Sequence, residues 1–355
     1  MTSQLPLKSP LQVSIFSMRP YLVPFVQRLQ QDFPETKTFE VKLDQQTAKL
    51  AQGSDAVCAF VNDDLSAPTL EVLAEGGVRC VALRCAGYDR VDCDAATSLA
   101  ISILRVPGYS PYAIAEHAVC LMLSLNRQIV KATERVRYGN FALSGLVGFD
   151  MHGKTVGVIG TGKIGRAVSS ILLGMGCEVI AHDVKQSEDA LRLGVRYVSL
   201  NELLERSHII TLHCPLTEST KYIIDADSIS RMRRGVMLIN TSRGALLDTA
   251  AVVAALNSRQ IGSLGIDVYE KEQDGLFFND LSSLTDGQPG ASLPDDWDEQ
   301  LSALGARPNV LVTPHSAFLT AEALHGIAET TVTNLKQFAQ GGECANAVCT
   351  ARDAQ

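Results

Sequence analysis

The stretch "VGVIGTGKIGRA", residues 156–167, carries Gly160, Gly162 and Gly165 in the spacing G-x-G-x-x-G. A run of β-branched residues precedes the first glycine, and the helical pattern "IGRAVSSILLGMG" follows the turn. A strand, a glycine turn and a helix in this order are typical of dinucleotide sites. The glycines allow a tight turn and a close approach of the backbone to the pyrophosphate, and the helix N-terminus attracts the anion. The spacing alone would be weak, because glycines are common where strands turn into helices, but its context favours a dinucleotide-binding fold.

An acidic residue follows at the position where such a fold reads the ribose. Asp183 ends the next expected strand, "EVIAHD", residues 178–183. A carboxylate there accepts hydrogen bonds from the ribose hydroxyls of NAD and repels the 2′-phosphate of NADP. The alternative is an aspartate in a surface turn. With the glycines in place, we predict NAD as the cofactor.

Strand patterns continue on both sides of this stretch. After residue 150 we expect six strands alternating with helices, which is the pattern of a doubly wound Rossmann domain, at residues 155–160, 178–183, 208–215, 236–242, 262–270 and 309–315. The last two are separated by residues 273–306, which are rich in Asp, Gly, Ser and Pro and include Trp297. We interpret this segment as a surface excursion.

The first hundred residues predict a second parallel sheet. Apolar runs separated by helical patterns lie at residues 13–17, 56–61, 78–87 and 102–106. The motif "VPGYSP" then ends the pattern, and a helical stretch over 112–138 begins. Its first half is apolar on more than one face, so we expect it to be buried between domains or subunits and to form a homodimer contact.

The expected fold class is α/β, with a Rossmann domain inserted into a flavodoxin-like domain. An amphipathic helix over 321–340 is expected to return to the first domain, which would make that domain discontinuous. We therefore predict domain limits of 1–108 and 316–355 for the discontinuous domain and 109–315 for the inserted one.

Composition excludes several other classes. The 355 residues are 46% hydrophobic and 20% charged with a net charge of −8, which argues against binding to nucleic acid. The N-terminus lacks the pattern of a secretory signal, and no apolar run is long enough to span a bilayer. The nine cysteines form no C-x-x-C motif, and the histidines show no metal-site spacing. We expect a cytoplasmic protein without metal, with reduced thiols that lie in apolar stretches at Cys58, Cys80, Cys85, Cys120 and Cys214.

Three candidate reacting groups follow neighbouring strands of the expected Rossmann sheet. "LINTSRGALLD", residues 238–248, places Arg243 after the fourth strand, before a glycine that would let the backbone pass close to another segment. Glu272 follows the fifth strand and His315 ends the sixth. Reduction of a carbonyl by NADH needs an acid near neutral pH and a cation, roles that suit histidine and arginine, and a carboxylate beside the histidine would favour its protonated form. Taken singly, His315 could be a loop histidine, Glu272 a solvated charge and Arg243 a partner of Asp248.

These residues resemble the D-isomer-specific 2-hydroxyacid dehydrogenase family, and within it the fermentative bacterial NAD-dependent D-lactate dehydrogenases. The likeness covers about residues 55–345 and rests on "AVCAFVNDD", "ALRCAGYDRVD", "AEHAVCLMLSLNR", "GVIGTGKIG", "LHCPLT", "INTSRGAL", "GSLGIDVYE" and "NVLVTPHSAFLTAEAL". The family's catalytic residues fall on Arg243, Glu272 and His315, with Glu270 as a competing carboxylate that we interpret as structural.

The resemblance also implies ligand contacts. Substrate contacts fall on the amides of Ala86 and Gly87, on Tyr109, and on Arg243 and His315 themselves. Beyond the glycines and Asp183, cofactor contacts fall on Lys163, Ile164, Cys214, Pro215, Thr220, Thr241, Ser242, Arg243 and Asp267. Thr220 stands where some relatives have asparagine. The segment 273–306 is longer than in close relatives.

The resemblance implies reduction of pyruvate to (R)-lactate by NADH in a homo-oligomer, without nucleic acid or membrane partners. A larger 2-oxo acid, such as a phenyl- or branched-chain pyruvate, is the alternative substrate. An NAD-sensing corepressor of the same fold is the alternative from another class, although no basic or disordered interaction tail supports it.

Overall fold

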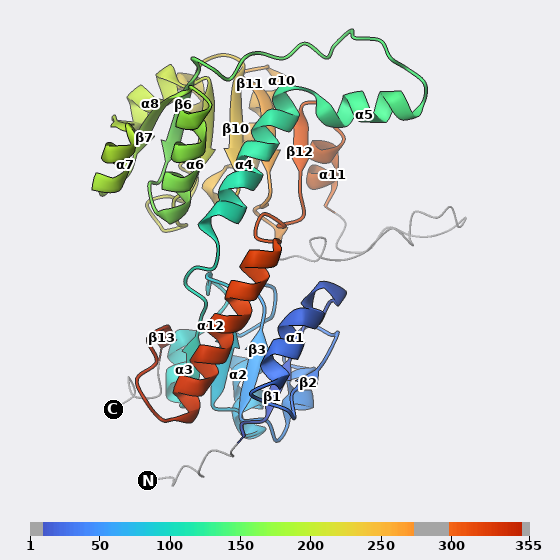
Figure 1. Cartoon of the computed structure of the whole chain (residues 1–355), viewed down its shortest axis with the longest axis vertical. Helices are drawn as coiled ribbons and strands as arrows, with labels where there is room; N and C mark the ends of the chain where they lie inside the picture. The colour runs from blue at the N-terminus through green and yellow to red at the C-terminus, as the bar shows by residue number, and fades with distance from the viewer. Residues whose placement is uncertain (1–9, 273–297, 350–355) are drawn as a thin grey trace. The chain divides into compact units, whose positions relative to one another are not determined.

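The computed structural model describes residues 10–272 and 298–349, and the chain forms two compact units (Figure 1). The first contains the residues up to Ser110 together with those from Leu319 onward, and the second is Pro111–Phe318. The sequence predicts these limits at 108 and 315. Within the described part of the chain, no helix is long and apolar enough to cross a membrane.

The second unit is built on a parallel seven-stranded sheet in the order β12-β11-β10-β9-β6-β7-β8. Its strands are β6 (Thr155–Ile159), β7 (Glu178–His182), β8 (Arg196–Tyr197), β9 (Ile209–Leu212), β10 (Val236–Asn240), β11 (Ile261–Ile266) and β12 (Val310–Val312). Six of these are the predicted strands, although several end earlier than expected, and their order is that of a Rossmann fold. The prediction missed β8, because two residues carry no period-2 pattern.

Helices cover both faces of this sheet. Neighbouring strand residues alternate between the faces, so that Val158 packs with α4 and α6 while Ile159 packs in the cluster formed with α8, α9 and α10. Both residues are almost completely buried. The helices of this unit are α4 (Pro111–Asn126), α5 (Ile129–Arg137), α6 (Lys163–Gly174), α7 (Glu188–Leu193), α8 (Leu200–Arg206), α9 (Ala226–Arg231), η3 (Gly244–Leu246), α10 (Thr249–Asn257) and α11 (Glu299–Gly305).

The prediction of a single helix over 112–138 is wrong, because this segment forms two helices, α4 and α5. Gln128 lies between them with φ of 51°, in the left-handed region that ends a helix. Apolar residues lie on more than one face of α4 because the helix is buried inside its own unit. The expected cause was burial between domains or subunits. A β-carbon at Gly265 of β11 would lie 3.2 Å from side-chain atoms of Leu121 and Leu125, so α4 packs closely on the sheet.

The first unit is built on a six-stranded sheet in the order β13-β5-β4-β3-β1-β2. Its strands are β1 (Val13–Ile15), β2 (Lys37–Thr38), β3 (Ala56–Ala59), β4 (Cys80–Leu83), β5 (Ser102–Leu104) and β13 (Ala347–Cys349). The first five strands run parallel in the flavodoxin-like order 2-1-3-4-5, and β13 adds an antiparallel edge. The prediction missed β2 and β13, which are short and lie at the two edges. The helices are η1 (Pro20–Leu22), α1 (Val23–Gln30), η2 (Ala48–Ala51), α2 (Ala67–Glu75), α3 (Cys93–Ser98) and α12 (Ala321–Ala339).

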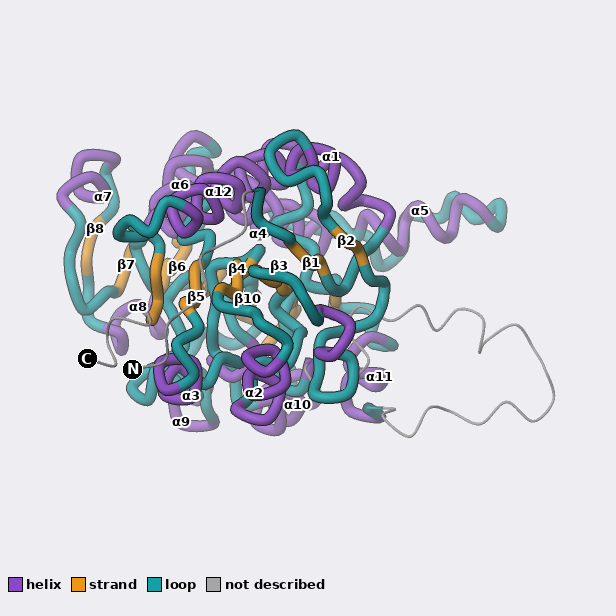
Figure 2. Tube along the Cα trace, turned by 90° about the horizontal axis from the view of Figure 1, so that it is seen from below, coloured by secondary structure: helices purple, strands orange, loops and turns teal. Residues whose placement is uncertain are grey.

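The returning helix is confirmed as α12, which packs against α1 and β4 of the first unit. Figure 2 shows α1 and α12 on the same side of β1 and β3 in the first unit. The Arg28 guanidinium donates to both carboxylate oxygens of Glu329 at 2.5 and 3.0 Å, which joins the two helices across the sequence. The Asn334 amide also donates to the Arg105 carbonyl at 2.8 Å.

Two further expectations need correction. Part of the predicted excursion is the helix α11, while residues 273–297, including Trp297, lie outside the described residues. All nine cysteines are free, but the thiols expected in apolar interiors are not all buried: Cys120 is exposed and Cys85 is half-buried. Cys120 lies on the face of α4 turned away from the core.

Candidate active site

The glycine turn has the close contacts that its spacing predicts. Gly160 has φ of +94°, and a β-carbon there would meet the backbone of His213 and Cys214 at 2.6–2.7 Å. A β-carbon at Gly165 would lie 2.0 Å from the Gly160 carbonyl oxygen. At Gly162, by contrast, a β-carbon would meet none of the described atoms within 4 Å. The first and third glycines therefore serve the chain's own packing, and the second leaves room for a ligand at the start of α6.

Asp183 is held against this turn. Its Oδ2 accepts hydrogen bonds from the Thr161 amide at 2.6 Å and the Thr161 hydroxyl at 2.9 Å, and its Oδ1 accepts one from the Lys185 amide. The Tyr197 hydroxyl donates to Thr161 at 2.7 Å and so supports the same arrangement. Partial burial raises the pKa of Asp183, but these hydrogen bonds outweigh it and hold the pKa below its ordinary value. The carboxylate is therefore ionised and fixed beside the glycine turn.

The other predicted cofactor residues lie along the same edge of the sheet. Lys163 and Ile164 open α6, while Cys214 and Pro215 follow β9. Thr220 lies further along that exposed loop and donates to the Pro215 carbonyl at 2.7 Å. After β10, the buried Thr241 hydroxyl has no partner among the described residues, and the Ser242 hydroxyl donates to the Cys214 carbonyl at 2.6 Å. Ser242 thereby joins the loops after β9 and β10.

Arg243 lies in the loop after β10, where the backbone is fixed on both sides. Its carbonyl accepts a hydrogen bond from the side-chain amide of Asn240 at 2.8 Å, and its guanidinium donates to the Ser242 carbonyl at 2.8 Å. Gly244 follows, and a β-carbon there would lie 2.1–2.3 Å from the backbone of Tyr269 and Glu270. The glycine thus lets the Arg243 loop press against the segment after β11. The Asp248 carboxylate caps α10 by accepting from the Ala251 amide at 3.1 Å.

His315 and Glu272 form the pair that the sequence predicts. The His315 Nδ1 atom lies 3.2 Å from Oε1 of Glu272, and the side chains are 19% and 12% exposed. The second Glu272 oxygen accepts from the Tyr269 amide at 3.2 Å, which fixes the carboxylate from behind. Because the carboxylate faces Nδ1, the Nε2 atom is the nitrogen available to a substrate. His315 itself has φ of 54°, an uncommon conformation for a residue with a β-carbon.

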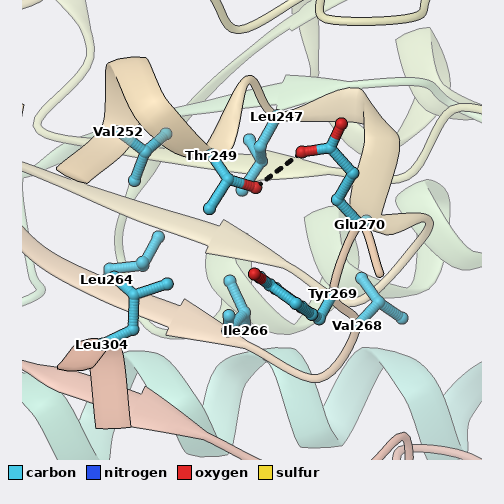
Figure 3. A pocket seen from close by; sticks show the side chains of 10 residues that line it. Leu247, Thr249, Val252, Leu264, Ile266, Val268, Tyr269, Glu270 and Leu304 are labelled. Carbon is cyan, nitrogen blue, oxygen red and sulfur yellow. Dashed lines mark hydrogen bonds between the residues drawn. The ribbon is translucent and has the colours of Figure 1, made fainter. Parts of the chain in front are cut away.

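The competing carboxylate, Glu270, has a structural role. It accepts hydrogen bonds from the Tyr222 hydroxyl and, at 2.9 Å, from the Thr249 hydroxyl. Figure 3 shows its side chain turned toward Thr249 beside a small, mainly aliphatic pocket, which Arg243, Glu272 and His315 do not line. The hydrogen bond to Glu270 also raises the pKa of Tyr222. Both oxygens of Glu270 are thus used to hold the loop after β11.

Asp267 is completely buried directly after β11. Its oxygens accept hydrogen bonds from the Thr313 hydroxyl at 2.5 Å, from the Ser316 amide at 2.9 Å and from the Ala317 amide at 2.8 Å. These three donors surround His315 in the sequence. Asp267, which the family resemblance predicts to lie near the cofactor, therefore holds the loop that carries the histidine.

The predicted substrate residues of the first unit lie after β4 and β5. The guanidinium of Arg105 donates to the Ala86 carbonyl at 3.1 Å and stacks on the Tyr88 ring. In a trans peptide the carbonyl and the following N–H point in opposite directions, so this bond turns the Gly87 N–H away from Arg105. The Cys85 thiol likewise donates to the Gly87 carbonyl at 3.2 Å. Tyr109 follows β5, with its carbonyl packed against Gly326 of α12.

Comparison with known proteins places this geometry in a family. The family model described as "D-isomer specific 2-hydroxyacid dehydrogenase, NAD binding domain" matches residues 119–317. The chain is 47% identical to the D-lactate dehydrogenase of Escherichia coli K12 over 337 residues, which cover 95% of this chain and 99% of the relative. The chain belongs to the D-isomer specific 2-hydroxyacid dehydrogenase family.

Two solved structures support this membership of the dehydrogenase family. The pyruvate reductase of Chlamydomonas reinhardtii is 47% identical, with a TM-score of 0.90 and coverage of 95% of this chain and 98% of that one. The D-lactate dehydrogenase of Aquifex aeolicus, solved with NAD and lactic acid, is 32% identical, with a TM-score of 0.81 and the same coverage. The second unit is therefore the NAD-binding domain of a dehydrogenase.

The residues of this unit fit NAD. The open position at Gly162, the helix start behind it and the fixed Asp183 carboxylate supply the features that a dinucleotide requires. Among the described residues, no group of three or more His, Cys, Asp or Glu side chains is arranged to hold a metal ion.

Several residues at this site escaped the sequence analysis. Thr161 and Tyr197 support Asp183, Arg105 orients the Ala86 peptide, and His117 contacts Thr313. Thr161 and His117 lie inside the quoted motifs "GVIGTGKIG" and "AEHAVCLMLSLNR", but the motifs do not reveal their contacts. The partners of Tyr197, Arg105 and His117 are distant in the sequence, so no local pattern reveals them.

Proposed function

We propose that this dehydrogenase reduces pyruvate to (R)-lactate with NADH. The observation that carries the proposal is the 3.2 Å pair of His315 and Glu272, which follows β12 and β11, with Arg243 after the neighbouring strand β10. An acid, its carboxylate partner and a cation at one sheet edge suit the reduction of a carbonyl next to a carboxylate. The D-lactate dehydrogenase and pyruvate reductase among the similar proteins support this substrate.

We assign the cofactor contacts as the sequence predicts them. Asp183 would hold the adenosine ribose, and the backbone from Gly160 to Gly165 with Lys163 and Ile164 would hold the pyrophosphate. The contacts nearest the adenosine would come from Cys214, Pro215 and Thr220, and those nearest the nicotinamide from Thr241, Ser242, Arg243 and Asp267. When bound, NADH supplies the hydride.

The chain's own groups would do the rest. Arg243 would bind the substrate carboxylate and polarise the carbonyl through its planar guanidinium. His315 would donate a proton from Nε2 to the oxygen of the carbonyl, and Glu272 beside Nδ1 would hold the imidazole in place. We also assign Ala86, Gly87 and Tyr109 to the substrate. Residues 1–108 and 316–355 would then form the substrate domain and residues 109–315 the cofactor domain.

Loss of NADH absorbance on addition of pyruvate tests this function. The product should be a substrate for a D-specific and not for an L-specific lactate assay. A panel with phenylpyruvate and branched-chain 2-oxo acids at equal concentrations identifies the preferred substrate. If one of these acids has a higher kcat/KM than pyruvate, that acid is the substrate and pyruvate is not. Absence of turnover with every 2-oxo acid would contradict an enzymatic role.

The assembly that we propose is a homodimer formed through an apolar arm. The arm consists of α5 and the loop to residue 149, and it extends from the rest of its unit (Figure 1). No residue of α5 is buried, and the loop exposes Tyr138 by 85%, Leu143 by 80% and Val147 by 91%. Lys131 and Arg135 donate to loop carbonyls, so the arm is internally ordered. Exposed apolar surface of this kind typically marks an interface, and the net charge of −8 complements its basic side chains.

Sedimentation at micromolar concentration tests the assembly. The wild type should sediment as a dimer or larger oligomer, and replacing Tyr138, Leu143 and Val147 with serine should shift it toward monomer. Leu191→Asp, at an exposed apolar position on α7, is the control and should not change the oligomeric state. A monomeric wild type would contradict the proposal. We further propose a cytoplasmic location, which the nine free cysteines support.

A further inference from the structure

The loop that carries His315, residues 313–317, is held from one side by Asp267. Oδ1 accepts from the Thr313 hydroxyl and the Ser316 amide, and Oδ2 accepts from the Ala317 amide. The carboxylate is completely buried, so these bonds are shielded from water. The loop is thereby fixed on both sides of the histidine.

A second histidine reaches the same loop from a different element. His117 lies on α4, and its Nε2 is 3.0 Å from the Thr313 hydroxyl and 3.5 Å from Oδ1 of Asp267. Its side chain is 22% exposed. Nothing in the proposed reaction so far uses this imidazole.

The hydrogen bonds determine which atom of His117 carries a proton. The Thr313 hydroxyl has one hydrogen, and the 2.5 Å distance to Asp267 assigns that hydrogen to the carboxylate. The Thr313 oxygen is then an acceptor toward His117, so the Nε2 atom must carry a hydrogen and donate it. His117, Thr313 and Asp267 therefore form a directed chain of hydrogen bonds that ends beside His315.

We propose that His117 is a positioning residue for His315 and acts through Thr313 and Asp267. The proposal rests on the proposed function, in which His315 is the proton donor. The left-handed backbone of His315 is unfavourable for a residue with a β-carbon and persists only where its neighbours hold it. His117 ties that loop to α4, a helix buried in the same unit, and thereby keeps the imidazole of His315 at the angle that proton transfer requires.

Four variants separate this role from general support of the fold. His117→Ala removes the donor, while His117→Gln retains an N–H group on a side chain of similar reach. Thr313→Val removes the hydroxyl that accepts the hydrogen bond from His117. The double variant His117→Ala/Thr313→Val completes a double-mutant cycle. His152→Ala, at an exposed histidine before β6, is the matched control and should behave as the wild type.

We expect His117→Ala to lower kcat for pyruvate by about tenfold to a hundredfold, which is the range for a misplaced catalytic group. The dissociation constant of NADH, measured by fluorescence, should change less than about twofold. With 4-deuterated NADH the primary isotope effect on kcat should exceed one, because the chemical step is the step that has slowed. His117→Gln should recover most of the activity, and the double variant should be no slower than the slower single variant, because both act on one chain of contacts.

Each contrary outcome is informative. Turnover of His117→Ala at the wild-type rate overturns the proposal, as does a slowed variant without an isotope effect. Additive losses in the double variant, or no recovery in His117→Gln, would show that His117 does not act through Thr313. His315→Gln separates failure of the proposed function from failure of the role of His117. If His315→Gln keeps wild-type turnover, the proposed acid is wrong. If His315→Gln is inactive and His117→Ala is unaffected, only the positioning role of His117 is wrong.

Discussion

The Nδ1 atom of His315 lies 3.2 Å from Oε1 of Glu272, although the two residues are 43 positions apart in the sequence. Two loops after adjacent parallel strands create this pair, because β11 and β12 end at the same edge. The relationship leaves Nε2 as the imidazole nitrogen available to a substrate. It also predicts how activity responds to the loss of each partner.

His315→Gln should lower turnover of pyruvate by about 10²–10⁴-fold, as expected for the loss of a general acid. Glutamine cannot donate a proton at neutral pH, but it fills a similar volume. NADH binding should therefore stay near its wild-type value. Steady-state kinetics and NADH titration measure the two effects, and wild-type turnover would place the acid elsewhere.

Glu272→Gln should lower kcat for pyruvate without weakening NADH binding. The glutamine keeps the size of the side chain, but the charge 3.2 Å from Nδ1 of His315 is lost, and with it the attraction that holds the imidazole in place. We expect a loss of about tenfold to a hundredfold, the range for a misplaced catalytic group. Glu270→Gln, which loses contacts to Thr249 and Tyr222 instead, is the control. A wild-type kcat in Glu272→Gln would contradict the pairing.

Asp183→Ala should narrow the preference for NADH over NADPH. Loss of a hydrogen bond to a charged group costs about 1.5–3 kcal/mol, which corresponds to roughly tenfold to 150-fold weaker NADH binding. NADPH binding should weaken less, because the repulsion between the Asp183 carboxylate and the 2′-phosphate of NADPH disappears as well. The ratio of kcat/KM for the two cofactors is the measurement, with Asp189→Ala on α7 as control. Equal wild-type activity with both cofactors would refute the assignment.

The sequence predicts the parts of this fold and site that depend on local patterns. The glycine turn, Asp183 and the six longer Rossmann strands follow from periodicity and spacing, and the structure contains all of them. The two-residue strands β2 and β8 are too short to show a period-2 pattern. The helix break at Gln128 was missed because the helical pattern of the sequence continues on both sides of it. Arg105 and His117 could not be predicted, because each acts on a segment brought close only by tertiary packing.

Arg105→Met should raise the KM for pyruvate more than it lowers kcat. The methionine keeps most of the volume but loses the hydrogen bond at 3.1 Å that orients the Ala86–Gly87 peptide. If the Gly87 amide binds the substrate carboxylate, a freely rotating peptide weakens binding by the typical value of one hydrogen bond, about 0.5–1.5 kcal/mol or up to roughly tenfold. Inhibition by oxamate, a pyruvate mimic, should weaken in parallel. Arg90→Met is the control, since Arg90 donates to the Asn62 carbonyl instead. Unchanged KM and oxamate inhibition would remove this peptide from the substrate site.

The contact between α1 and α12 predicts a pH-dependent contribution to stability. Arg28 donates to Glu329 and, at 2.8 Å, to Asp32, which also pairs with Lys336 at 2.6 Å. The hydrogen bonds from Arg28 lower the pKa of both carboxyl groups in the folded protein. Groups with a depressed folded pKa stabilise the fold above their unfolded pKa values, about 3.9 for Asp and 4.3 for Glu, and lose this contribution as the pH falls through the folded values.

Arg28→Met should therefore lower the midpoint of thermal unfolding at neutral pH more than at pH 3, which is below the unfolded pKa values, so that part of this contribution is already lost in the wild type. The pairs are partly exposed, so solvent screening limits the loss to about 0.2–1 kcal/mol for each. Arg192→Met is the matched control, because Arg192 pairs with Glu188 and Asp189 of its own helix and its side chain is 72% exposed. Differential scanning calorimetry at the two pH values measures the difference. An equal loss at both would assign the effect of Arg28 to packing of its aliphatic stem between α1 and α12 and not to its charge.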